Sequence, residues 1–155
     1  MTCIGKFLLS IDVSSAAIAD VRSLLVEKTS QPIINETYHH AVSDALLGAL
    51  GLGDIGKYFP PSDPSIAGID SLLIVKKCLA MVKEKGYEVH NVDVSISAQE
   101  PKLAPFILEM KGNLALALEI KESQTSIKAM TNEGLDAVGK GEAIKASAIL
   151  LLMKE

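Results

Sequence analysis

The chain has 155 residues and a net charge of −4, and 48% of its residues are hydrophobic but only 4% are aromatic. This length fits one domain over residues 1–155 with an aliphatic core. The negative charge argues against a general basic surface for nucleic acid, and no apolar run approaches the ~20 residues of a membrane helix. Its two cysteines, Cys3 and Cys78, form no CxxC pair, and no signal-peptide pattern is seen, so we expect a cytoplasmic protein.

The apolar pattern predicts an α/β fold. Segments with strand character are residues 3–13, 92–100, 125–130 and 143–153. Segments with helical spacing are residues 16–28, 36–50, 69–85 and 103–119, the last with Pro105 in its first turn. The third helix is expected to end at Gly86 and to bury Leu72, Leu73, Val75, Cys78, Leu79 and Val82. The last strand alternates loosely, so we expect both of its faces to be buried.

The central strand leads to the first candidate site residue. Proline lacks a backbone N–H and restrains the residue before it, so Pro101 should end this strand near Glu100. Lys102 then lies on a loop just past the strand. A lysine there suits a phosphate or pyrophosphate, since it is a point charge with three donors. The alternative is a solvated lysine after a turn.

Two further stretches carry candidate site residues. His40 and Asp44 are four residues apart on a predicted helix and share a face, so the acid could orient the imidazole as it binds a metal. An ordinary surface pair is the alternative. His39 is a possible substitute ligand, although its side chain points about 100° away from that of His40 on a helix. Asp54 lies in a Gly- and Pro-rich loop, where it either accepts hydrogen bonds from sugar hydroxyls or caps a turn.

Three motifs, in this order, resemble those of one enzyme family. The first is Asp44-Ala45-Leu46-Leu47-Gly48-Ala49 followed by Gly53-Asp54-Ile55-Gly56-Lys57-x-Phe59-Pro60. The second is Asn91-Val92-Asp93-Val94-x-Ile96-x-Ala98-Gln99-x-Pro101-Lys102. The third is Lys128-Ala129-x-Thr131-x-Glu133-x-Leu135 with Gly139-Lys140-Gly141-Glu142. Together they resemble the 2-C-methyl-D-erythritol 2,4-cyclodiphosphate synthases of the non-mevalonate isoprenoid pathway.

This resemblance implies a fold and an assembly. The expected fold is a four-stranded mixed sheet with helices on one face, in a homotrimer with active sites between subunits. The family's trimer axis encloses an apolar cavity closed by a layer of basic and acidic side chains. Lys140 and Glu142 could supply that layer, which makes an isoprenoid diphosphate a candidate ligand.

The resemblance also implies a reaction. A phosphate of the substrate attacks the β-phosphorus of its own cytidine diphosphate arm, and a cyclic diphosphate and CMP are formed. Thr131 and Lys102 match the catalytic positions that hold the phosphates. The matched substrate-binding positions are Asp54, Gly56, Phe59, Asp63, Ala98, Pro101, Lys102, Leu103, Ala104 and Lys140.

The family uses divalent cations, zinc together with magnesium or manganese. His40 matches a zinc ligand with Asp44 behind it, and Glu133 matches the ligand of the second cation. The family's Asp-x-His pair in the first strand is damaged here. One alignment keeps the acid as Asp12 but puts Ser14 in place of the histidine, and the other leaves Leu9 and Ile11.

A second departure lies just before the helix that carries His40. The family's substrate-closing loop, His-Ser-Asp-Gly-Asp, falls on residues 32–36, and Pro32 cannot replace its histidine. The family also has strands and a Gly-rich turn where residues 16–28 suggest a helix. Two hypotheses follow. One is a cyclodiphosphate synthase with an impaired metal site, and the other is a catalytically silent trimeric homologue that binds cytidine nucleotide or isoprenoid phosphates.

Overall fold

The computed structural model describes the backbone of residues 4–12 and 30–154, and the side chains of residues 34–154. Four strands form one sheet in the order β1-β4-β2-β3. Their bounds are Ile4–Asp12 for β1, Tyr87–Ser97 for β2, Thr125–Met130 for β3 and Lys145–Lys154 for β4. β4 runs antiparallel to β1 and β2, whereas β2 and β3 are parallel. The predicted α/β class with a mixed sheet is therefore confirmed.

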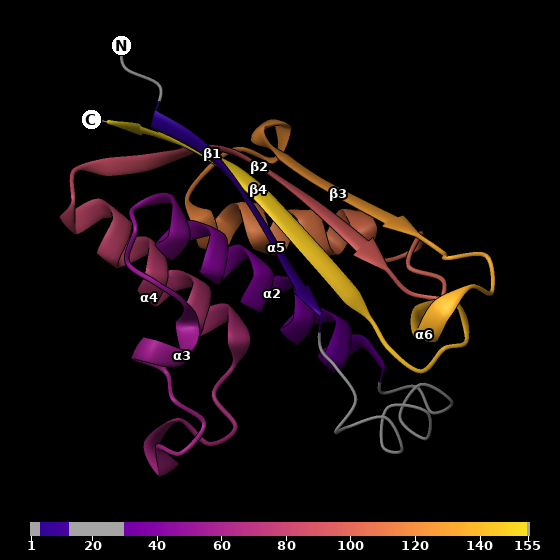
Figure 1. The fold of residues 1–155 in the computed structure, drawn as a ribbon. Helices are drawn as coiled ribbons and strands as arrows, with labels where there is room; N and C mark the ends of the chain where they lie inside the picture. Colours follow the sequence, from indigo (N-terminus) through magenta and orange to yellow (C-terminus); the bar gives the residue numbers. More distant parts are fainter. Residues whose placement is uncertain (1–3, 13–29, 155) are drawn as a thin grey trace.

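The longer helices lie together on one side of this sheet (Figure 1). They are α2 (Ser30–Ala49), α4 (Ser71–Glu84) and α5 (Ile107–Leu118). Two four-residue helices, α3 (Ile55–Tyr58) and α6 (Asp136–Gly139), lie in the connections. The predicted helix over residues 16–28 falls outside the described residues.

Alternation along β4 shows which face of the sheet carries the core. Ala146, Ala148, Leu150 and Leu152 are at most 2% exposed, whereas Ile149 and Leu151 on the other face are only half-buried. The expectation that both faces are buried is wrong for one chain alone. Cys78 lies in the same core, where burial raises the pKa of its thiol to about 11.

The element boundaries correct three other expectations. α2 begins six residues before the predicted Glu36, because a proline is tolerated in a helix's first turn, where its missing N–H has no partner to lose. α5 begins later than predicted, so Pro105 precedes it. β2 ends at Ser97, three residues before Glu100.

One burial expectation is also wrong. In α4, Leu73 is 47% exposed, since it points away from the buried stripe.

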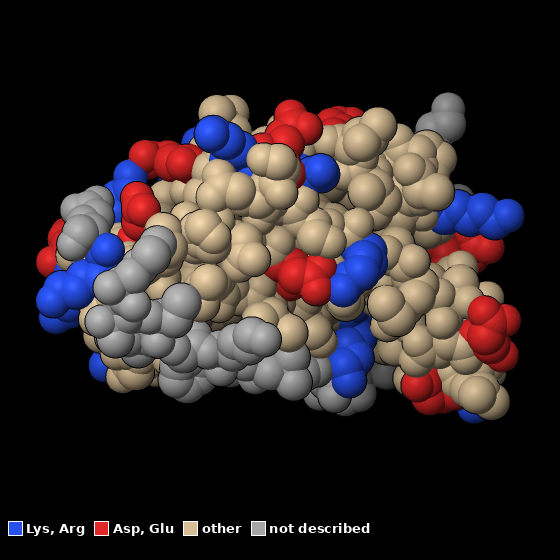
Figure 2. Space-filling model, turned by 90° about the horizontal axis from the view of Figure 1, so that it is seen from above, with Lys and Arg blue, Asp and Glu red and all other residues tan. Residues whose placement is uncertain are grey.

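No helix within residues 30–154 is long and apolar enough to cross a membrane. In the view of Figure 2, the coloured basic and acidic residues form small mixed groups around uncharged surface. The described residues thus form no continuous basic strip on this face.

Replacement of Leu150 by alanine should lower the free energy of unfolding by about 2–5 kcal/mol, because it leaves a cavity between β4 and the helices. Urea denaturation measures this change. Leu116→Ala is the matched control, since Leu116 is 77% exposed on α5, and its effect should stay within about 0.5 kcal/mol. Equal effects of the two substitutions would contradict the assigned core face.

Candidate functional site

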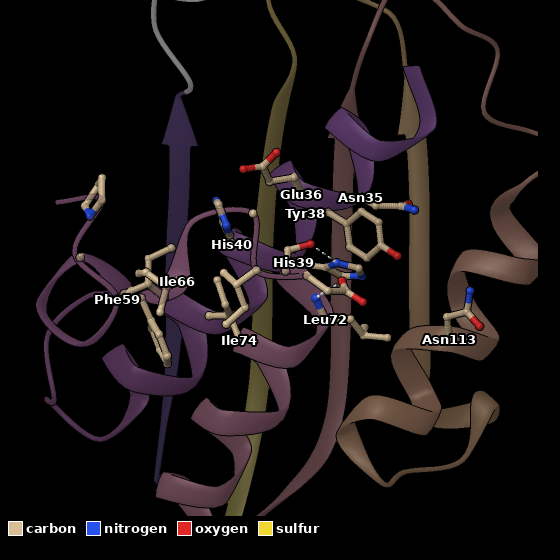
Figure 3. Close-up of a pocket in the computed structure, with 17 residues that line it drawn as sticks. Asn35, Glu36, Tyr38, His39, His40, Phe59, Ile66, Leu72, Ile74 and Asn113 are labelled. Atoms are coloured by element: carbon tan, nitrogen blue, oxygen red, sulfur yellow. Dashed lines mark hydrogen bonds between the residues drawn. The ribbon is translucent and has the colours of Figure 1, made fainter. Parts of the chain in front are cut away.

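A cavity of about 860 Å³ lies between α2, α4 and the segment around α3. This volume is in the usual range for small-molecule sites. His40, Gly56 and Phe59 of the predicted site all line it, and Figure 3 shows their surroundings. Ile66 and Ile74 add apolar surface beside Phe59. The structure therefore brings together a histidine of α2 and the loop that the sequence singled out.

Asp44 joins α2 to this loop. Its Oδ1 accepts the backbone N–H of Ile55 at 2.7 Å, and the side chain is 7% exposed. Burial raises the pKa of Asp44, and the Ile55 N–H partly offsets the rise. The sequence suggested that Asp44 orients the imidazole of His40, but the described side chains show no hydrogen bond between the two. The carboxylate fixes the position of α3.

Asp54 caps α3. Its Oδ1 accepts the Lys57 N–H at 3.1 Å, which is the capping alternative raised from the sequence. A Cβ on Gly56 would lie 3.3 Å from the same oxygen, so glycine keeps space beside the carboxylate. Asp63 likewise caps the 3₁₀ turn Pro64–Ile66 and accepts the Ser65 N–H at 2.9 Å, a bond that lowers the pKa of Asp63.

A second group of predicted site residues lies at the carboxyl ends of β2 and β3. The parallel pairing of these strands brings both ends to one edge, and Ala98 N–H donates to the Met130 carbonyl at 3.0 Å. Thr131, the residue after Met130, therefore lies next to Ala98. After Ala98 the chain continues through Pro101, Lys102, Leu103 and Ala104, of which Lys102 and Ala104 are exposed and Leu103 is 4% exposed.

The loop after β3 holds Thr131, Glu133 and Lys140. The Thr131 hydroxyl donates to Glu133 Oε1 at 2.8 Å, so these two predicted residues are in direct contact. Glu133 is exposed and has φ 51°, in the left-handed region that glycine normally occupies. Lys140 ends α6 and is exposed. This edge thus presents a carboxylate, a hydroxyl and two lysines to solvent.

Asp136 shapes this loop. Its Oδ1 accepts the N–H groups of Val138 at 2.8 Å and Gly139 at 3.1 Å, and its Oδ2 accepts the Asn132 side chain at 2.8 Å. The Gly139 N–H and the Asn132 amide hold the pKa of Asp136 below its ordinary value. A Cβ on Gly139 would come within 2.5 Å of the Gly134 backbone, so the loop closes only with glycine at residue 139.

The two groups of predicted residues do not meet within one copy of the chain. Figure 1 shows α3 and the segment after it at one end of the molecule, and α6 with the ends of β2 and β3 at the other. The cavity holds His40, Gly56 and Phe59, whereas Lys102, Thr131 and Glu133 belong to the sheet edge.

The described side chains do not by themselves form a zinc site. Within residues 34–154, no three side chains of His, Cys, Asp or Glu lie close enough to hold one ion. His40 alone of the expected zinc ligands has a described side chain. Asp12 ends β1 opposite Lys145, but its side chain is outside the description.

The sequence did not reveal the buried contact of His39 with Ser71. His39 Nδ1 lies 2.8 Å from Ser71 Oγ on α4, and burial lowers the pKa of His39 to about 4. His39 is 4% exposed, and its ring meets Tyr38 edge-on at 4.3 Å between centroids. Local spacing in the sequence carries no signal for this contact, because Ser71 is 32 residues away from His39.

Comparison with known proteins gives consistent matches. The model of the family described as YgbB matches residues 36–153. The chain is 50% identical over 116 residues to 2-C-methyl-D-erythritol 2,4-cyclodiphosphate synthase of Nostoc punctiforme, which is 75% of this chain and 72% of that protein. For the same enzyme of Thermosynechococcus vestitus, the identity is 52% over 113 residues, with 73% and 70% covered. A solved CDP-bound structure of such a synthase has a TM-score of 0.69 and 30% identity over 74% of each chain.

Asp44→Leu should destabilise the protein by about 1–3 kcal/mol relative to Asp44→Asn. The leucine leaves the Ile55 N–H without its acceptor, whereas asparagine keeps an oxygen there. Urea denaturation of the two variants side by side measures the difference. Equal stability would show that the Asp44–Ile55 bond does not hold α3 in place.

Asp136→Asn should make the free energy of unfolding less dependent on pH in the acid range. A carboxyl with a lowered folded pKa stabilises the protein above its unfolded pKa, near 3.8, and this contribution is lost as pH falls through the folded pKa. The wild type should therefore exceed the variant at pH 5–7, and the gap should shrink below about pH 4. Denaturant titrations across this range measure the gap, and a gap independent of pH would refute the assignment.

Proposed function

Because the chain belongs to the 2-C-methyl-D-erythritol 2,4-cyclodiphosphate synthase family, we propose that it catalyses the family's cyclisation with release of CMP, at a rate reduced by an impaired metal site. The observation that carries this proposal is the sheet edge. There the parallel strands place Ala98, the first residue of the segment Ala98–Ala104, beside Met130, and the Thr131–Glu133 pair follows Met130 directly. The CDP-bound structure of a relative supports a cytidine-containing ligand. We place the enzyme in the cytoplasm.

The separation of the two groups of residues supports a homotrimer. A single copy holds the cavity and the sheet edge at opposite ends, so a site that uses both needs two copies. The half-buried apolar face of β4, with Ile149 and Leu151, is available to such an assembly. An isoprenoid diphosphate on the trimer axis, near Lys140 and Glu142, belongs to the same proposal.

In the proposed reaction, an oxygen of the substrate's 2-phosphate forms a bond to the β-phosphorus of the cytidine diphosphate arm. The bond from this phosphorus to the oxygen shared with the α-phosphorus breaks, and CMP leaves with that oxygen. Lys102 and the Thr131 hydroxyl hold the phosphates, and the segment Ala98–Ala104 lines the cytosine. In-line alignment of the two phosphates supplies much of the rate.

Metal chemistry enters this proposal at one point only. Glu133 could hold a magnesium or manganese ion together with substrate phosphates, and the ion would neutralise their charge, since such ions need only one or two carboxylates. Asp54 Oδ1 and Asp63 Oδ1 each cap a local turn, so hydroxyl groups of the substrate would contact the Oδ2 atoms of these residues. The proposed step uses no zinc ion, because Ser14, or the apolar pair Leu9 and Ile11, stands where the family has zinc ligands.

The second candidate is a catalytically silent trimer that binds cytidine nucleotide. Residues 32–36, which align with the family's closing loop, begin α2 in this chain. Helical backbone at this point does not provide the loop that closes over substrate. This favours a protein that has lost activity but still binds the nucleotide at the sheet edge.

Lys102→Ala should lower CMP release from 4-diphosphocytidyl-2-C-methyl-D-erythritol 2-phosphate by about 100-fold, because it removes a charge that stabilises the reacting phosphates. The assay follows CMP by chromatography with Mg²⁺, with and without Zn²⁺. Lys85→Ala is the matched control, since Lys85 is an exposed lysine after α4, and should react like wild type. CMP binding to folded wild type without any turnover would select the silent homologue.

A further inference from the structure

The turn that carries Glu133 has an unusual backbone. The Leu135 N–H donates to the Asn132 carbonyl at 2.8 Å, which closes a tight turn over residues 132–135. The two central residues of this turn, Glu133 with φ 51° and Gly134 with φ 79°, are both left-handed. Residues other than glycine, asparagine and aspartate seldom adopt this backbone, and such costly conformations cluster at functional sites. A glutamate at residue 133 therefore needs the rest of the loop to hold it in place.

One carboxylate fixes the residue before Glu133. Asp136 Oδ2 accepts a hydrogen bond from the Asn132 side chain at 2.8 Å. Asp136 Oδ1 accepts the backbone N–H groups of Val138 and Gly139 in α6. Asp136 thereby ties Asn132 to α6, which Figure 1 shows beside the ends of β2 and β3.

Close packing fixes the residue after Glu133. A Cβ on Gly139 would lie 2.5 Å from the carbonyl carbon of Gly134, so the glycine lets α6 lie directly against the turn. The backbone on both sides of Glu133 is thus anchored to α6. The Thr131 hydroxyl orients the Glu133 carboxylate from a third direction, at 2.8 Å from Oε1. Glu133 is nevertheless exposed, so its carboxylate remains accessible to a ligand.

Anchoring of this kind matters for a residue that binds a cation. A carboxylate that is already held in place loses less conformational entropy when the ion arrives than one on a mobile loop. Hydrogen bonds that orient metal ligands from behind therefore strengthen metal binding, although the residues that make them do not touch the metal. Both oxygens of Asp136 are engaged within the loop, so Asp136 acts through Asn132 and not on the substrate.

We propose that Asp136 is a positioning residue that, through Asn132, holds Glu133 in the orientation that binds a divalent cation together with the substrate's phosphates. The inference rests on the cation-binding role proposed above for Glu133. It extends that role by linking the strength of cation binding to two residues that the resemblance does not assign. Nucleotide binding without the cation should not depend on the Asp136–Asn132 bond.

The test measures how strongly Mn²⁺ and CDP favour each other's binding, and it requires no turnover. Calorimetry gives the dissociation constant of CDP without Mn²⁺ and with saturating Mn²⁺, and the ratio of the two is the coupling factor. Glu133→Gln keeps the shape of the side chain and gives the coupling factor in the absence of the carboxylate. Wild type should have a larger factor than this variant.

Asn132→Ala should lower the coupling factor toward the Glu133→Gln value by about fivefold, as expected for one lost hydrogen bond. The affinity for CDP without Mn²⁺ should stay at the wild-type value, which a general loss of structure would not allow. Asn91→Ala, at an exposed position in the first half of β2, is the matched control and should keep the wild-type coupling factor.

A double-mutant cycle separates positioning from direct contact. Asp136→Ala should lower the coupling factor at least as much as Asn132→Ala, and combining the two should add nothing, because residues that act as a unit are not additive. Additive losses would show that Asn132 contacts the ligand itself, and would overturn the proposal. Asn132→Ala removes only one side-chain bond, so it tests the proposal even if Asp136→Ala fails to fold.

The outcomes also separate this inference from the proposed function. A coupling factor that is present in wild type and unchanged in Asn132→Ala would overturn the positioning role alone. Equal coupling factors in wild type and Glu133→Gln would overturn the cation-binding role of Glu133 and the positioning role with it.

Discussion

Parallel pairing of β2 with β3 is the constraint on which the sheet edge depends. Parallel strands need a long crossover, and α5 supplies it while covering the sheet. The two strands then finish side by side, so residues some thirty positions apart in the sequence become neighbours. Antiparallel β4 starts from the same edge, and the loop that carries Thr131 and Glu133 has to turn there.

The cavity depends on a different scaffold. α2 provides His39 and His40 from its middle turns, and Asp44 further along the same helix holds the start of α3 through one buried hydrogen bond. Burying a carboxylate costs free energy unless it is hydrogen-bonded, so the folded protein has to keep the Asp44–Ile55 contact. The position of Gly56 and Phe59 relative to His40 thus follows from the Asp44–Ile55 bond.

Much of this arrangement could be predicted from the sequence, because periodicity reports burial directly. Val92, Val94 and Ile96 alternate with polar residues and are at most 2% exposed. Thr131 was correctly expected at the end of a strand. Leu73 was expected in the core and is 47% exposed, since a run of two leucines does not indicate which one faces inward.

Contacts between distant residues could not be predicted in the same way. The partner of Asp44 is eleven residues away on a loop, and the partner of His39 is on another helix, so local spacing carries no information about either. The start of α2 was also missed, because Pro32 and its neighbours were aligned with a loop of the family. A proline is compatible both with the first turn of a helix and with a loop, and only the packing of the whole chain distinguishes the two.

The distance between the cavity and the sheet edge affects how the protein responds to dilution. In Figure 1, α3 and the carboxyl ends of β2 and β3 lie at opposite ends of the one copy drawn. Any activity that needs both would require association of copies, and its specific rate would fall once the protein concentration drops below the dissociation constant of the assembly. Residues at the contact between copies would then be under the same selection as those that touch the ligand.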